Sequence, residues 1–179
     1  LFIVFLQNIF KEKKMNEDET LEIISGDVFQ GDSDVLMNPC NCERTLYWGT
    51  HVSGHIFWHA GKKVKKERDK AGFLKFGEYC LTSGGKLKHK HILHIAVHKA
   101  KSLDMGYLFK RKKRIEEETL KKTLDSIHDF CKKNSFEKID IPLFWGGTNG
   151  WSDEEFKKKF SSHKALDKVI IYKAKKWFI

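Results

Sequence analysis

Residues 21–61 read LEIISGDVFQGDSDVLMNPCNCERTLYWGTHVSGHIFWHAG, and this stretch decides the fold. Its short apolar runs, Leu21–Ser25 and Asp34–Asn38, are typical of buried strands. A Gly-Asp turn separates the two runs, and a glycine-bearing loop leads from the second into an amphipathic helix that begins at Val52. This order places polar groups and a helix N-terminus at the carboxyl edge of a sheet, where open α/β folds bind ligands. The stretch therefore predicts a nucleotide-like pocket.

The remainder of the chain continues the alternation of strands and helices. We expect one helix from Val52 to about Gly72, with its charged second half KKVKKERDK on the outer face. The other predicted elements are strands over Glu78–Thr82, His91–Val97, Lys138–Leu143 and Leu166–Tyr172, a helix over about Arg114–Lys133, and a helix that Ser152 caps. This alternation predicts α/β layering, with helices on both faces of a largely parallel sheet.

Composition limits the class of protein. A chain of 179 residues with 40% hydrophobic content suits one domain with a packed core. The formal net charge of +10 leaves two interpretations open, a polyanionic partner or a solvated lysine surface. The four cysteines are too few for a disulfide framework, so we expect a reducing, intracellular location, with Cys80 and Cys131 in the core.

The N-terminal segment is treated apart from the domain. LFIVFLQNIF is apolar but too short to span a bilayer as a helix, and it lacks the features of a secretory signal, so no membrane association is expected. We expect residues 1–19 to be an appendage: a translation artefact, the end of a longer chain, or an extra strand or helix. The domain itself is predicted to cover residues 20–179.

Three sets of polar or glycine residues follow predicted strands. Asp27 could accept hydrogen bonds from an exocyclic amine or a ribose, or bond its own backbone in a turn. Asn38 and Asn41 suit sugar hydroxyls, or form a turn. The segment Trp145–Gly150, WGGTNG, can form an anion-binding concavity through backbone N–H groups. It matches neither a P-loop nor G-x-G-x-x-G, which disfavours a nucleoside triphosphatase or a dinucleotide enzyme.

In order and spacing, these elements resemble the macro domains, which bind ADP-ribose. Ser25–Val28 resembles the family's Gly-Asp-Ile element, and Val35–Asn41 resembles its Ile-Val-Asn-Ala-Ala-Asn strand. The other matching segments are Trp48–Gly54, His59–Gly61, Phe76–Glu78, Thr82–Leu87, Ile92–His94 and Ile141–Gly150. The resemblance covers about Leu21–Tyr172 and implies a three-layer α/β/α fold with a central mixed, mostly parallel sheet. It implies ADP-ribose or an ADP-ribosylated protein as partner and no cofactor.

The resemblance also assigns ligand contacts. Asp27 would hold the adenine amine with the Val28 backbone nearby, and Asn41 would contact the distal ribose. Asn38, on the same strand, is included among the predicted ligand-binding residues. Two loops would clasp the diphosphate through backbone N–H groups; their residues are Gly49, Thr50, His51, Val52, Trp145, Gly146, Gly147, Thr148, Asn149 and Gly150.

Departures from the family pattern bear on catalysis. The first loop is Trp-Gly-Thr-His where the family usually has three or four glycines, and Ser53 stands where many hydrolytic members have an aspartate. Serine is a poor general base without an activator. If the chain removes ADP-ribose from proteins, we expect Asn41, His51 and Ser53 to take part, with His51 as a weak acid or base or a water positioner. The sequence leaves open whether the protein is a hydrolase or a binder.

The sequence contains residues for two other types of site. His51, His55 and His59 recur on one helix face near Cys40 and Cys42, but the outer histidines are about 12 Å apart along a helix, so no metal is expected.

The second is a nucleic-acid-binding or poly(ADP-ribose)-binding module. It would use the basic runs KKVKK, KHK and KRKKR and four of the five tryptophans, Trp48, Trp58, Trp145 and Trp151. No sequence motif of a known nucleic-acid-binding fold is present. We expect a monomer in either case.

Overall fold

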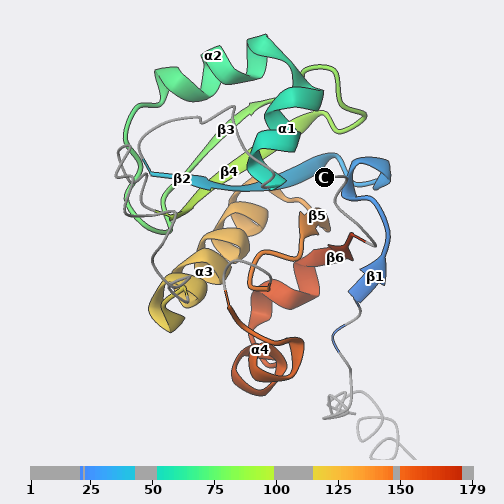
Figure 1. Cartoon of the computed structure of the whole chain (residues 1–179), viewed down its shortest axis with the longest axis vertical. Helices are drawn as coiled ribbons and strands as arrows, with labels where there is room; N and C mark the ends of the chain where they lie inside the picture. The colour runs from blue at the N-terminus through green and yellow to red at the C-terminus, as the bar shows by residue number, and fades with distance from the viewer. Residues whose placement is uncertain (1–20, 22, 43–51, 99–114, 147–149, 175–179) are drawn as a thin grey trace, which may run out of the picture.

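The computed structural model describes residues 21, 23–42, 52–98, 115–146 and 150–174, which form three layers (Figure 1). Helices α1 (Val52–Ala60) and α2 (Lys62–Lys70) cover one face of a central sheet. Helices α3 (Glu117–Asn134) and α4 (Asp153–Phe160) cover the other face. The predicted three-layer α/β/α architecture is confirmed.

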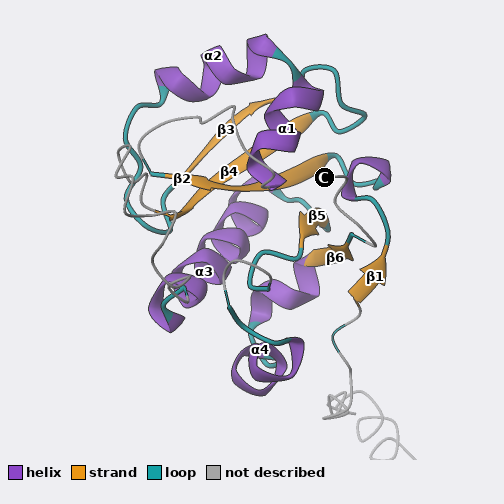
Figure 2. Ribbon diagram, in the orientation of Figure 1, coloured by secondary structure: helices purple, strands orange, loops and turns teal. Residues whose placement is uncertain are grey.

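The sheet has six strands in the order β1-β6-β5-β2-β4-β3 (Figure 2). All neighbouring pairs are parallel except β3 with β4, so the predicted mixed, mostly parallel sheet is confirmed. The strands are β1 (Ile23–Ser25), β2 (Val35–Asn41), β3 (Tyr79–Ser83), β4 (His91–His98), β5 (Ile139–Pro142) and β6 (Val169–Lys173).

Strand β2 lies in the middle of the sheet and is buried from Val35 to Cys40. Its continuous apolar run follows from the helices on both faces, because neither face of the strand meets water. Successive side chains point to opposite faces of a sheet. Met37 accordingly lies in the core beneath α3 and α4, while Leu36 lies in the core beneath α1 and α2.

The single helix predicted from Val52 to about Gly72 is wrong, because two helices meet at Gly61. Gly61 has a φ of +89°, in the left-handed region that favours glycine. The loop after β3 holds this break: the backbone N–H of Lys86 donates to the carbonyl of Ala60 at 3.1 Å. The last turn of α1 is therefore satisfied by this loop and not by a continuing helix.

The C-terminal elements follow the sequence more closely. The capping box of α4 is confirmed, since Glu155 N–H donates to Ser152 Oγ at 3.1 Å and Ser152 N–H donates to Glu155 Oε2 at 2.9 Å. The last strand begins at Val169 and not at Leu166, because Lys164–Lys168 forms a short 3-10 helix.

Two predictions about buried cysteines have different outcomes. Cys131 is buried in the core under α3, as expected. Cys80 is only half-buried because it lies on the edge strand β3. No helix in the described part of the chain is long and apolar enough to cross a membrane. The predicted appendage, residues 1–19, lies outside the described residues.

Candidate functional site

The carboxyl ends of the parallel strands form the edge at which the sequence predicts a ligand. Strand β1 ends there at Ser25, and β2 ends there at Asn41. Val52, the first residue of α1, packs in one cluster with Phe29 and with Tyr172, which lies near the carboxyl end of β6. The turn after β1, the end of β2 and the N-terminus of α1 therefore belong to one region of the molecule.

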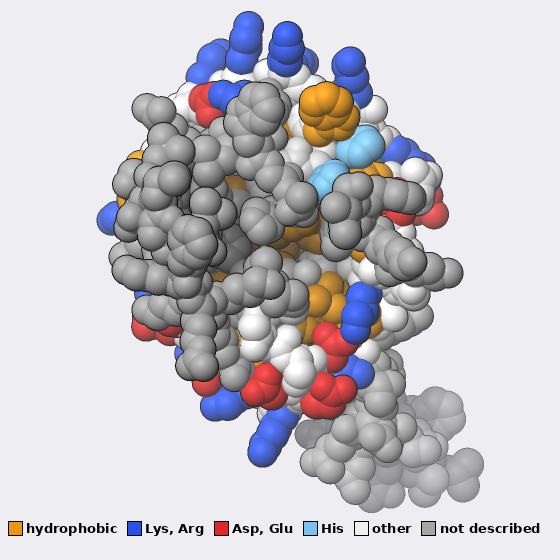
Figure 3. Space-filling model, in the orientation of Figure 1, with side chains coloured by type: hydrophobic (Ala, Val, Ile, Leu, Met, Phe, Trp, Pro, Cys, Tyr) orange, Lys and Arg blue, Asp and Glu red, His pale blue; other side chains and the backbone are white. Residues whose placement is uncertain are grey.

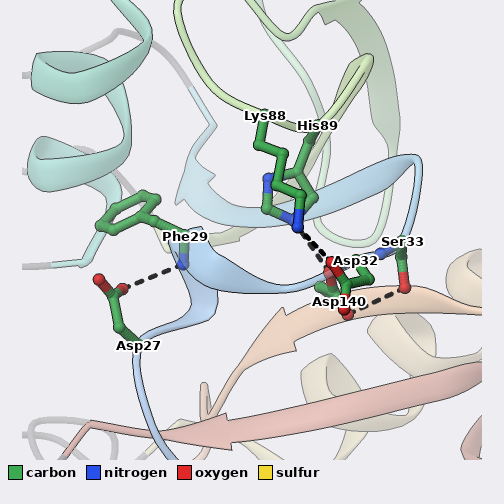
Figure 4. A network of polar contacts seen from close by, with 7 residues as sticks. All are labelled: Asp27, Phe29, Asp32, Ser33, Lys88, His89 and Asp140. Carbon is green, nitrogen blue, oxygen red and sulfur yellow. Dashed lines mark hydrogen bonds and ion pairs between the residues drawn. The ribbon is translucent and has the colours of Figure 1, made fainter.

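Asp27 forms the turn directly after β1, and its side chain is exposed. Its Oδ1 accepts a hydrogen bond from the backbone N–H of Phe29 at 3.0 Å and caps the short 3-10 helix Val28–Gln30. Figure 4 shows the other carboxylate oxygen of Asp27 directed away from this bond. Asp27 therefore does stabilise its own turn, and it uses only one of its two carboxylate oxygens to do so. The Val28 side chain is buried, so Val28 could meet a ligand only through its backbone.

Phe29 is a residue that the sequence analysis did not single out. Its ring lies against the ring of His59 on α1, with 4.6 Å between the ring centroids. Figure 4 shows the Phe29 ring extending toward α1 from the same turn as Asp27. An aromatic surface two residues beyond the Asp27 carboxylate offers a flat apolar contact for a base. An aromatic residue two positions after Asp27 was the only sequence signal for it.

Asn41 lies at the end of β2, where the pairing with β4 shifts register between Cys40 and Asn41. The guanidinium of Arg68, on α2, holds this strand end. Its Nη2 donates to the carbonyl of Asn41 at 3.1 Å and to that of Cys42 at 3.5 Å, while Nη1 donates to the carbonyl of Gly72 at 2.9 Å.

Arg68 is only 1% exposed, which corrects the expectation that the whole of KKVKKERDK lies on the outer face. The signal was present in the sequence, because Arg68 follows Val64 at the same helical spacing as the apolar positions before it. The Arg68 charge also stabilises the thiolate of Cys40, but burial outweighs it and raises the pKa of that thiol to about 11.

The structure does not bring Asn38 to the carboxyl edge. Its side chain is fully buried under α1, where Nδ2 lies 2.9 Å from Nδ1 of His94. Nε2 of His94 lies 2.9 Å from Oγ1 of Thr82, whose hydroxyl donates to the carbonyl of Ser83. This arrangement suits a neutral His94 protonated on Nε2, and burial lowers the pKa of His94 to about 3. Asn38 thus links β2 to β4 and β3 inside the fold.

The Trp145 side chain is also internal. It stacks on Phe156 with 3.7 Å between ring centroids, and its Nε1 donates to Oδ1 of Asp153 at 3.1 Å. Any contact of Trp145 with a ligand would therefore come from its backbone. Gly146 lies in the segment after β5, four residues beyond Pro142, and Gly150 has a φ of +80° that favours glycine.

A second polar network lies in the half of the sheet nearer the amino ends of the strands (Figure 4). The fully buried Asp140 accepts from Ser33 N–H at 3.1 Å and from Ser33 Oγ at 2.9 Å, and its Oδ2 lies 2.9 Å from Nε2 of His89. Lys88 pairs with Asp32 beside it. This network fixes the segment that returns from Asp27 to β2. The His89 side chain is fully buried in this network.

Comparison with known proteins identifies the family. The family model described as "Macro domain" matches residues 37–160. The chain belongs to the macro domain family. Members of this family generally bind ADP-ribose.

Among individual relatives, an uncharacterised protein of Aquifex aeolicus is 25% identical over 158 residues, which cover 84% of this chain and 88% of that protein. Human protein mono-ADP-ribosyltransferase PARP14 is 25% identical over 126 residues, or 70% of this chain but only 6% of the human protein.

Solved macrodomain structures share the fold. The Oceanobacillus iheyensis macrodomain with ADP has a TM-score of 0.61 at 21% identity, covering 85% of this chain and 80% of that one. The macrodomain of Mycobacterium tuberculosis DarG has a TM-score of 0.64 at 17% identity, covering 84% of this chain and 97% of that one. At these identities the likeness concerns the fold.

The described part of this macro domain contains only some of the predicted site. Asp27, Asn41, Val52, Gly146 and Gly150 are described, and Ser53 lies half-buried in the first turn of α1. The predicted site residues outside the described ranges are Gly49, Thr50, His51, Gly147, Thr148 and Asn149. Their roles stay predictions.

Chemically, the described groups of this macro domain suit binding of a polar nucleotide-like ligand. Asp27 supplies an exposed carboxylate and Phe29 supplies an aromatic ring. Asn41 lies at the end of β2, which the buried guanidinium of Arg68 holds in place. Within the described residues, no three His, Cys, Asp or Glu side chains converge to hold a metal ion.

Proposed function

We propose that this macro domain binds ADP-ribose, free or attached to a protein, at the carboxyl edge of its sheet. The observation that carries the proposal is the placement of Asp27. Its exposed carboxylate caps the turn after β1 through one oxygen, beside the Phe29 ring. A carboxylate oxygen accepts hydrogen bonds, as an adenine amine requires, and the neighbouring ring offers apolar contact to the base.

Other residues would contact the distal ribose and the diphosphate of ADP-ribose. Asn41 would contact the distal ribose from the end of β2, which Arg68 holds through the carbonyls of Asn41 and Cys42. The backbone from Gly146 onward and the N-terminus of α1 would face the diphosphate, because free N–H groups and helix N-termini favour anions. Asn38 and the Trp145 side chain support this site from the interior.

Hydrolysis of ADP-ribosyl links is a second part of the proposal, which would use Asn41, His51 and Ser53. Ser53 stands at the start of α1 in place of the aspartate of many hydrolytic members. A hydroxyl without an activator is a weak base, so slow turnover or binding alone is the expected behaviour. Loss of any measured hydrolysis in His51→Ala would support the acid–base role of His51, and unchanged hydrolysis would refute it.

The test is calorimetric titration of ADP-ribose into the full chain, compared with Asp27→Asn. Asparagine is as good an N-cap as aspartate, so this variant keeps the turn. Its amide can still accept from Phe29 N–H, but it then presents an NH₂ donor to the adenine amine donor, and we expect at least a tenfold loss of affinity.

Asp34→Asn is the matched control. It removes one negative charge from an exposed aspartate that pairs with Lys90, at the start of β2. Saturable one-to-one binding that is weakened in Asp27→Asn and unchanged in Asp34→Asn would support the proposal. Equal affinities in all three proteins, or no binding by the wild type, would refute it.

A nucleic-acid-binding surface is the second candidate function, because the structure exposes one of the four tryptophans weighed for it. That surface is formed by other residues than the ADP-ribose site. A monomeric state and an intracellular location stay predictions.

A further inference from the structure

Trp58 is the most exposed large apolar side chain in the described part of the chain. It is 78% exposed on α1, although its neighbours Ile56, Phe57 and Ala60 are buried. Phe73, three residues beyond α2, is 61% exposed. Large aromatic rings are usually covered, and rings left in water often mark interaction sites. Along the chain, helix α2 is therefore flanked by two exposed aromatic side chains.

The outer side of α2 carries a row of lysines. Val64 and Arg68 are buried, so the opposite side of the helix faces solvent, and Lys62, Lys66 and Lys70 lie there at intervals of four residues. At 1.5 Å per residue the row is about 12 Å long. Lysine and arginine side chains gather over α2 in Figure 3.

Positive charge is in excess on α2, which carries five lysines and one arginine against one glutamate and one aspartate. Glu67 accepts hydrogen bonds from Ser83 and pairs with Lys63 at 3.8 Å, and Asp69 pairs with Lys65 at 2.7 Å. Among the ion pairs of the described residues, none includes Lys62, Lys66 or Lys70. The row therefore presents a net positive charge to solvent and fits an anionic partner.

Exposed aromatic rings combined with a basic track are the features that bind single-stranded nucleic acid, because bases stack on the rings and phosphates pair with the lysines. A duplex keeps its bases stacked within itself and would leave Trp58 unused. A membrane surface requires an apolar helix face, and the exposed side of α2 has lysines instead. A purely acidic peptide would pair with the lysines but would give the aromatic rings no planar partner.

We propose that the α2 surface, formed by Trp58, Lys62, Lys66, Lys70 and Phe73, binds single-stranded nucleic acid. The α2 surface shares no residue with the carboxyl-edge contacts Asp27 and Asn41, so it does not depend on the ADP-ribose proposal. The two ligands are expected to bind at the same time.

The test is fluorescence anisotropy of a labelled short oligothymidylate titrated with the full chain at several salt concentrations. Oligothymidylate contains no adenine, so it does not mimic ADP-ribose. Replacing the lysine row, K62Q/K66Q/K70Q, is expected to reduce the slope of log K against log salt by about 2, since each phosphate contact contributes about 0.7. Trp58→Ala should weaken binding about fivefold or more through lost stacking, while Trp58→Phe keeps most of the affinity.

The control K121Q/K132Q/K133Q removes the same charge from exposed positions of α3, on the opposite face of the sheet. Saturating ADP-ribose is a second control and should not displace the oligonucleotide. An equal loss in the two triple variants would show that only net charge matters and would overturn the proposal. No binding by the wild type, full affinity in Trp58→Ala, displacement by ADP-ribose, or a preference for poly(ADP-ribose) over oligothymidylate would overturn it as well.

Discussion

The hydrogen-bond partners of the buried Arg68 guanidinium are backbone carbonyls at the end of β2 and after α2. A buried cation needs hydrogen bonds to offset its lost hydration, and a buried carbonyl needs a donor. Arg68 satisfies both requirements at once. It therefore connects the stability of the fold to the position of Asn41, the residue assigned to the distal ribose.

This role makes Arg68→Met a sharp test at the scale of one residue. Methionine can fill the volume but cannot donate, so the carbonyls of Asn41 and Gly72 would lose their partner. We expect the free energy of unfolding in urea to fall by about 1–3 kcal/mol for each carbonyl left unpaired.

Lys66→Met is the control, because Lys66 lies on the exposed side of the same helix. Its effect should stay within about 0.5 kcal/mol. If Arg68→Met were as stable as Lys66→Met, the carbonyls would have other donors and the bridging role would be wrong.

At the scale of elements, the segment between β1 and β2 is fixed by close contact with the sheet. Gly31 is buried, and a Cβ built on it would collide with the Asp140 carboxylate. Its φ of −59° suits any residue, so only the lack of space requires glycine here. Asp140 cannot move away without losing the hydrogen bonds from Ser33.

Gly31→Ala should therefore destabilise the protein by about 1–3 kcal/mol or more, as overpacking does in a filled core. Thermal or urea unfolding would measure the loss. Gly26→Ala is the matched control in the same segment, since its added Cβ would meet ordinary contacts at 3.8 Å. Equal stability of the two variants would mean that the segment can shift away from the sheet.

Periodicity and end signals in the sequence were sufficient for most elements but not for the contacts between them. Buried strands and the capping box of α4 follow from local patterns. The break at Gly61 depends on Lys86, a loop residue that reaches α1 only in the folded chain. A helical pattern that continues across the break could not show it.

The same limit explains the candidate site. Asp27 and Asn41 could be chosen from motif order, and the structure places both at strand ends. Asn38 looks equivalent to Asn41 in the sequence, yet its place within the buried stretch of β2 and its partner His94 keep its side chain inside the fold. Phe29 and Arg68 become informative only through tertiary contacts with His59 and with the end of β2.

At the scale of the whole molecule, two aspartates near opposite ends of the sheet have different roles. Asp27 lies in the turn after β1, is exposed, and is assigned to a ligand. Asp140 lies toward the amino ends of the strands, is fully buried, and holds Ser33 and His89. The carboxylate assigned to the ligand and the carboxylate that holds the fold thus lie in different places. Substituting Asp27 should therefore change ligand affinity, and substituting Asp140 should change stability.

Asp140→Asn should lower the free energy of unfolding by about 2–5 kcal/mol. The amide keeps the volume but turns one acceptor into a donor, which leaves a buried donor of Ser33 or His89 unpaired and removes the charge beside His89. At urea concentrations below its unfolding transition, the Asp140→Asn variant should bind ADP-ribose within about twofold of the wild type, because the carboxyl-edge contacts are intact.

Asp27→Asn should show the reverse behaviour, with weakened binding and a free energy of unfolding within about 0.5 kcal/mol of the wild type. Urea unfolding and calorimetric titration of both variants measure the two effects. If Asp140→Asn lost affinity as strongly as Asp27→Asn while still folded, the two ends of the sheet would be coupled, and binding and stability would not depend on separate carboxylates.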